Sequence, residues 1–175
     1  MFPPLPDWDG LHPLVVHFPI ALLMTAPLLV IASLVWRRYR LPIGTCALVV
    51  MALGASGAFL AVATGEAAEE AAERIAAAKP VLEQHEELAE RVRIYFAVLT
   101  AAYALVLFNP LAKKPLEPLV PIAAGVVFLL IYVGGLLLLA HTAHYGGRLV
   151  HEFGVHAPVV SGAVLGGTGK VEDDD

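Results

Sequence analysis

Charged side chains are scarce in this sequence. Asp, Glu, Lys and Arg make up 15% of its 175 residues, against about 25% in an average soluble protein. Hydrophobic residues make up 58%, and the mean hydropathy is +0.74. This composition excludes a soluble enzyme and indicates a membrane protein. Because the net charge is −5 and no long basic stripe is present, we expect no nucleic-acid partner.

Cysteine is almost absent, since Cys46 is the single thiol of the chain. One cysteine excludes both an internal disulfide framework and a CxxCH site for covalent haem. Cys46 lies inside an apolar run, so we expect it to be a buried packing residue. The sequence also lacks a phosphate-binding loop, a Ser-His-Asp arrangement and a paired-carboxylate site. An enzyme acting on its own is therefore not favoured, and no catalytic residue is predicted.

Long hydrophobic runs dominate what is present. A helix needs about 20 apolar residues to cross roughly 30 Å of hydrocarbon, and three of four runs satisfy this length. The third run is shorter, but apolar residues precede it, so we expect its helix to begin before Ile94. The pattern predicts an all-α fold, a four-helix transmembrane bundle, with its spans at Pro13–Trp36, Leu41–Ala63, Ile94–Phe108 and Leu119–Ala140.

Basic residues predict which way this bundle faces. Two short loops, 37–40 and 109–118, hold the densest lysines and arginines, and such loops stay in the cytoplasm. Both termini are then outside, in a bacterial inner membrane with lipid as the surrounding partner. The connection 64–93 is rich in helix formers, so helices two and three are expected to extend as an outer hairpin. We expect one domain over residues 1–161 and a disordered acidic tail over 162–175.

The histidines gather on one side of this predicted topology. All seven fall at the outer ends of their helices or in the outer segments, and ionisable residues at membrane depth are candidates for function. For any single one, an interfacial histidine bonded to a neighbour is an equally good interpretation. They are His12, His17, His85, His141, His144, His151 and His156.

Helical geometry separates these residues into levels. His144 and His151 lie on one face if the last helix continues through Gly146-Gly147, whereas His12 and His17 project about 140° apart and cannot face the same neighbour. His17 is the inner of the two. It is therefore expected to approach the last helix, while His12 lies further out.

Neutral imidazoles on facing helices of a bundle are how bis-histidine haem b is held. We therefore expect His17 to bind haem iron together with His144 or His85, with one or two haems in total. Arg148 is placed to meet a haem propionate. A compact copper or zinc site is the competing interpretation, in which Glu86 and Glu152 are ligands or support the ligands.

Two segments resemble a known family. Residues 11–22, LHPLVVHFPIAL, and 144–151, HYGGRLVH, are similar to the HPxxVHFPIAL and HxGGxLVH motifs of a bacterial family of four-helix membrane proteins of unknown function. Thr64-Gly65-Glu66 and His85 also fit its pattern. The resemblance implies a place in electron transfer beside c-type cytochromes or other respiratory subunits. It assigns site roles to His12, His17, His85, His144, His151, Gly146 and Gly147, and not to His141 or His156.

Three functions follow from these observations. The leading hypothesis is a membrane b-type cytochrome subunit with its haem on the outer side. The second is an outer-face copper or zinc protein that uses the same histidines as metal ligands. The third is a structural or assembly subunit of a respiratory-type complex, or of a homo-oligomer, in which the histidines only form hydrogen bonds. An optical spectrum distinguishes the first from the others.

Overall fold

The computed structural model describes residues 8–108 and 119–155, and within these residues all regular structure is helical. The all-α prediction is therefore confirmed for the described part of the chain. Three short elements are η1 (Trp8–Leu11), α1 (His12–Val15) and η2 (Arg37–Tyr39). The long helices are α2 (His17–Val35), α3 (Arg40–Glu73), α4 (Lys79–Leu107) and α5 (Leu119–His151).

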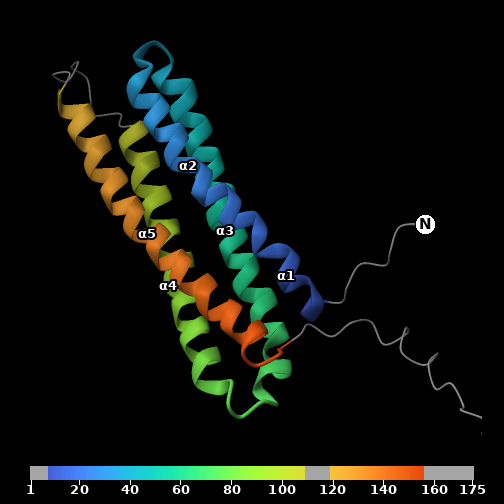
Figure 1. Ribbon diagram of the computed structural model, residues 1–175. Coiled ribbons are helices and arrows are strands. Elements are labelled where there is room, and N and C mark those ends of the chain that lie inside the picture. The colour runs from blue at the N-terminus through green and yellow to red at the C-terminus, as the bar shows by residue number, and fades with distance from the viewer. Residues whose placement is uncertain (1–7, 109–118, 156–175) are drawn as a thin grey trace, which may run out of the picture.

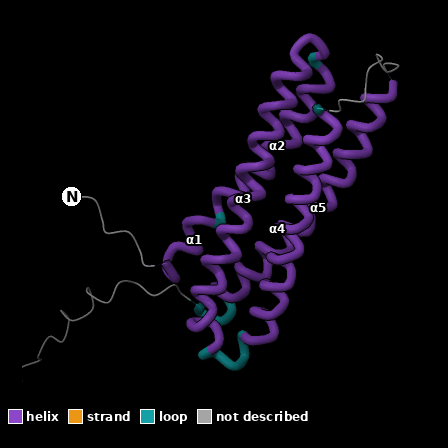
Figure 2. Tube along the Cα trace, turned by 180° about the vertical axis from the view of Figure 1, so that it is seen from behind, coloured by secondary structure: helices purple, strands orange, loops and turns teal. Residues whose placement is uncertain are grey.

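The long helices form an elongated antiparallel bundle (Figure 1). Helix α3 packs against α2 and α4, while α5 packs against α4 and α2. At one end lie α1, the turn between α3 and α4, and the end of α5, as the view from behind also shows (Figure 2). We call this the hairpin end. The hairpin predicted between the second and third spans is present and is formed by α3 and α4. Helix α5 runs unbroken through Gly146-Gly147 to reach the same end.

Three segments are long and apolar enough to cross a membrane: His12–Val35, Arg37–Glu70 and Val120–His151. Helix α4 does not meet this criterion over the described residues. Length and composition therefore identify three of the four expected spans. The reason is the composition of α4, because its first half is charged and the apolar remainder, residues 94–107, is only about 21 Å long. The predicted cytoplasmic loop 109–118 and the predicted tail 162–175 lie outside the described residues.

A proline inside α2 creates a bond between helices. Pro27 has no N–H, so the carbonyl of Leu23, four residues earlier, loses its helical partner. The hydroxyl of Tyr132 on α5 donates to that carbonyl at 2.9 Å. Tyr132 is fully buried, so this bond satisfies two polar groups that are out of reach of water.

Two apolar clusters hold the bundle together. The first fills the middle and contains Leu23, Ala26, Val30, Ala47, Met51, Ala55, Val92, Phe96, Leu99, Tyr103 and Tyr132. The second joins the end of α5 to the α3–α4 turn and contains Ala72, Ala78, Val81, Leu82 and Leu149. Along α4, His85 falls between Leu82 of the second cluster and Val92 of the first.

The expectation that Cys46 is buried is wrong, because its side chain is exposed on α3. Its neighbour Ala47 faces the bundle instead. In a membrane segment, an apolar run carries no information on which side chains face lipid, since lipid is as apolar as the bundle interior. The small residues of α3 behave as ordinary helix contacts, with Gly54 against Leu23 and Gly57 against Phe18.

Candidate histidine site

Two of the predicted histidines meet in the bundle. His12 is the first residue of α1, and His85 lies in the second turn of α4. Their ring centroids are 6.4 Å apart, and the ring planes are nearly perpendicular, at 89°. Both side chains are half-buried.

The His12 ring is held by helix α3. Its Nδ1 lies 2.9 Å from the carbonyl oxygen of Ala61 and 3.2 Å from the hydroxyl of Thr64. A carbonyl oxygen only accepts hydrogen bonds, so Nδ1 carries the proton and Nε2 keeps its lone pair. Thr64 is fully buried, and its own hydroxyl donates to backbone carbonyls of the preceding turn.

The His85 ring is held in the same way by helix α5. Its Nδ1 donates to the carbonyl oxygen of Thr142 at 3.0 Å, which again leaves Nε2 with a lone pair. Histidines that bind metals commonly donate their other ring N–H to a carbonyl or carboxylate, because that bond fixes the tautomer and the ring orientation. Burial lowers the pKa of His85 below its ordinary value, which favours the neutral, ligand-competent ring at pH 7.

A glycine lies against each ring. A Cβ added to Gly65 would be 3.1 Å from Cε1 of His12, and one added to Gly146 would be 3.0 Å from Cε1 of His85. Gly65 follows Ala61 by four residues, and Gly146 follows Thr142 by four. The neighbouring Gly147 differs, since its Cβ would meet nothing within 4 Å. The two glycines of the predicted pair therefore have unlike surroundings.

The remaining predicted histidines lie elsewhere. His17 is exposed on α2, and its Nδ1 donates to the carbonyl oxygen of Pro13 at 2.6 Å. His144 is also exposed, with its ring 5.9 Å from that of Tyr145, and His151 is exposed at the end of α5. The structure therefore brings His85 together with His12, and not with the His17 that the sequence favoured. His141 lies beside Tyr145, and His156 is outside the described residues.

Arg148 is paired with residues of its own helix. Its Nε lies 3.0 Å from both carboxylate oxygens of Glu152, and its guanidinium lies over the Tyr145 ring. Both residues expected to support a cofactor, Arg148 as a propionate partner and Glu152 as a metal ligand, are thus engaged with each other.

Glu86, the other carboxylate considered as a ligand, shares a hydrogen bond with Glu69 across the α3–α4 hairpin. Burial, together with the nearby carboxylates of Glu69, Glu73 and Glu83, raises the pKa of Glu86 to about 7. Over residues 8–108 and 119–155, no group of three or more His, Cys, Asp or Glu side chains is arranged to hold a metal ion.

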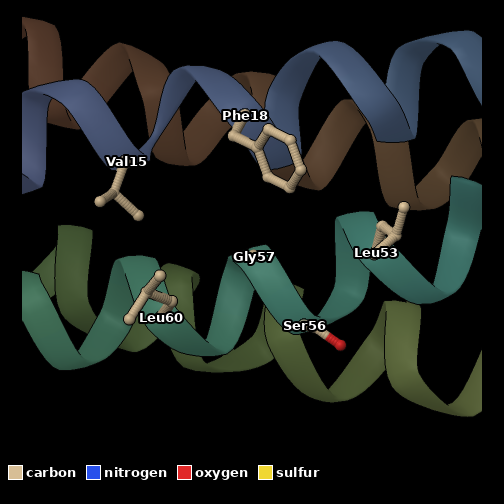
Figure 3. Close-up of a pocket in the computed structure, with 6 residues that line it drawn as sticks. All are labelled: Val15, Phe18, Leu53, Ser56, Gly57 and Leu60. Carbon is tan, nitrogen blue, oxygen red and sulfur yellow. The ribbon is translucent and has the colours of Figure 1, made fainter.

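A groove of about 400 Å³ lies between α3 and the neighbouring helices α1 and α2. Figure 3 shows its lining, which is apolar apart from the hydroxyl of Ser56. Neither His12 nor His85 lines it. The groove residues are Val15, Phe18, Leu53, Ser56, Gly57 and Leu60.

Sequence reasoning identified His12 and His85 but missed what holds them. The backbone carbonyls of Ala61 and Thr142 leave no trace in a sequence. Thr64 and Gly65 were noticed only as part of a motif, without a role. The available signal was the pairing of these glycines with a nearby hydroxyl residue, Thr64 beside Gly65 and Thr142 four residues before Gly146.

Residues 9–158 match the model of a family described as predicted membrane protein, DUF2231. The match covers most of the chain, which therefore belongs to this family of membrane proteins. No curated protein and no solved structure matches the chain.

Proposed function

We propose that this DUF2231 protein binds one haem b between His12 and His85 and serves as an electron-transfer subunit of a bacterial inner membrane. The observation that supports the proposal best is the pair of imidazoles, each with its Nδ1 bonded to a backbone carbonyl and its Nε2 left as a ligand. Two such rings from different helices are the protein's share of a bis-histidine haem site.

The ring separation agrees with this assignment. Imidazole nitrogens bind a metal at about 2.0 Å, so two rings on opposite sides of one metal have centroids about 6.3 Å apart. The separation of His12 and His85 is 6.4 Å. Two rings that share a tetrahedral ion have closer centroids, at about 5 Å. The observed spacing fits opposite coordination better than a shared tetrahedral ion, and it is also the spacing of an ordinary edge-to-face ring contact.

The number of ligands also favours haem. A structural zinc site needs four protein ligands, and a catalytic one needs three. In haem, the macrocycle supplies four donors, so two histidines complete the iron. When bound, haem supplies reversible one-electron transfer. The chain holds the two rings at a fixed tautomer, while the apolar clusters on either side of them along α4 limit access of water.

The orientation of the protein follows from its charges. Arg37, Arg38 and Arg40 lie at the end of the bundle opposite the histidine pair, and basic connections remain in the cytoplasm. We therefore propose that both termini and the hairpin end lie outside and that α4 is the fourth membrane segment, with its charged first half in the head-group layer and beyond. A haem at the hairpin end is accessible to an outer-face partner such as a c-type cytochrome or another respiratory subunit.

The test is an optical spectrum of the purified protein, with haem measured as pyridine haemochrome and metals by elemental analysis. We expect a Soret band, the split visible bands of six-coordinate haem after reduction, and about one haem per chain. His12→Ala and His85→Ala should abolish the low-spin spectrum. His144→Ala is the matched control, because that ring is exposed on α5, and it should retain the haem.

Each other result contradicts the proposal. Protein without porphyrin but with stoichiometric copper or zinc would establish the ion site instead. Purified protein without porphyrin, copper or zinc would favour a structural role for the chain. A spectrum lost in His144→Ala and kept in His12→Ala would place the haem on other ligands.

A further inference from the structure

The two rings are held by one repeated arrangement. In each case a side chain donates to the carbonyl of helix residue n, and residue n+4 of that helix is a glycine. The helix explains the pairing, because the N–H of residue n+4 already bonds the carbonyl of residue n. At His12 and His85, the ring that reaches this carbonyl lies against the Cα of residue n+4, so that an added Cβ would come within 3.0–3.1 Å of Cε1. The arrangement is not obligatory, because Tyr132 reaches the Leu23 carbonyl where residue n+4 is Pro27.

The same arrangement occurs once more among the described residues, without a histidine. The Tyr95 hydroxyl donates to the carbonyl of Ile131 at 2.7 Å, and a Cβ on Gly135 would lie 2.6 Å from the Tyr95 ring. This case shows that the arrangement is not confined to histidine rings. At His12 and His85 it acts on two rings that face each other.

We infer that Gly65 and Gly146 are positioning residues that set the orientation of the His12 and His85 imidazoles, an inference that rests on the proposed haem site. The α1–α3 pair and the α4–α5 pair then present equivalent units, each with one histidine, one carbonyl and one glycine. A methyl group at either glycine pushes Cε1 of its histidine, at 3.0–3.1 Å. The ring would then have to shift by a few tenths of an ångström, and the position of its Nε2 would change with it.

The test substitutes each glycine with alanine, with Gly147→Ala as the matched control, since its Cβ meets nothing within 4 Å. The readouts are the ferric electron paramagnetic resonance spectrum and carbon monoxide binding to the ferrous protein. The parent should show the strongly anisotropic low-spin signal of perpendicular imidazole planes and should not bind carbon monoxide. Gly65→Ala and Gly146→Ala should change or lose that signal and bind carbon monoxide, while Gly147→Ala matches the parent.

The inference fails separately from the proposed function. If the parent contains haem that depends on His12 and His85, but the spectra of Gly65→Ala and Gly146→Ala equal that of Gly147→Ala, the glycines do not position the rings. If the parent contains no haem, the proposed function itself is wrong.

A variant that does not accumulate is also informative. In a His12→Ala background the methyl of Gly65→Ala meets no ring, so the double variant should accumulate as well as His12→Ala alone. If the double variant is lost too, Gly65 is needed for helix packing and the positioning role is overturned.

Discussion

His12 and His17 begin the same apolar segment, yet their surroundings are opposite. His12 bonds to α3 and faces His85, whereas His17 is exposed and bonds to the turn before it. The helical angle correctly predicted that the two residues face different neighbours. The sequence analysis nevertheless favoured His17 as the haem ligand, because that residue is further inside the helix. Depth along a helix does not determine which side faces the bundle.

At Thr64, a small change tests whether the hydrogen bonding of His12 affects the proposed haem. Thr64→Val keeps the shape of the side chain and removes the oxygen 3.2 Å from Nδ1, leaving the Ala61 carbonyl as acceptor. A net hydrogen bond contributes about 0.5–1.5 kcal/mol, which corresponds to roughly 20–60 mV for a one-electron couple. We expect the midpoint potential to rise by this amount, because a less polarised imidazole donates less charge to ferric iron.

A potentiometric titration of Thr64→Val against the parent measures this shift. Thr100→Val is the control, because its hydroxyl bonds only within α4, to the carbonyl of Phe96. An unchanged potential in Thr64→Val would mean that the hydroxyl does not act on the ring.

At the scale of the helix, proline and tyrosine act as one unit. Tyr132→Phe leaves the buried Leu23 carbonyl without a partner, because Pro27 has no N–H to offer. An unsatisfied buried carbonyl costs about 1–3 kcal/mol, so we expect a corresponding loss of stability in thermal unfolding of the detergent-solubilised protein.

The control is a double-mutant cycle. In Pro27→Ala, the restored N–H of residue 27 can bond the Leu23 carbonyl, so Tyr132→Phe should cost less in that background. If Tyr132→Phe lowers the stability equally in the parent and in Pro27→Ala, the hydroxyl stabilises the fold through some other contact.

The sequence predicted most of the helices, because periodic apolar runs and turn residues are local signals. The hairpin expected in the connection 64–93 is formed by α3 and α4, and α5 meets the condition of continuing through Gly146-Gly147. The contact between Tyr132 and Leu23 was not predictable, since it joins residues 109 positions apart. The His12–His85 pair was missed for the same reason, because it depends on how the α2–α3 and α4–α5 pairs pack together.

At the scale of the whole molecule, the α3–α4 hairpin should make stability depend on pH. The pKa of Glu86 is raised from 4.5 to about 7, so the folded state favours the protonated carboxyl group. Its stabilising effect is complete below about pH 4.5 and is lost as the pH rises through about 7. Glu86→Gln should remove this dependence, whereas Glu70→Gln, which only breaks an exposed ion pair with Arg74, should keep it. The test is the unfolding temperature of each variant measured from about pH 4.5 to pH 7. Identical pH profiles for the parent and Glu86→Gln would show that Glu86 does not cause the pH dependence.

The orientation of the bundle is the remaining property of the whole molecule, and it decides which compartment the histidine pair serves. The exposed residue Ala77 lies in the α3–α4 turn, and Tyr39 is exposed at the opposite end, between α2 and α3. In a Cys46→Ala background, we expect Ala77→Cys to react with a membrane-impermeant maleimide added to intact spheroplasts, and Tyr39→Cys to react only after lysis. The reason is the positive-inside rule, since Arg37, Arg38 and Arg40 surround Tyr39, while residues 64–93 on either side of the α3–α4 turn hold eight glutamates against four basic residues. The reverse labelling pattern would put the site in the cytoplasm, where a periplasmic c-type cytochrome could not be its partner.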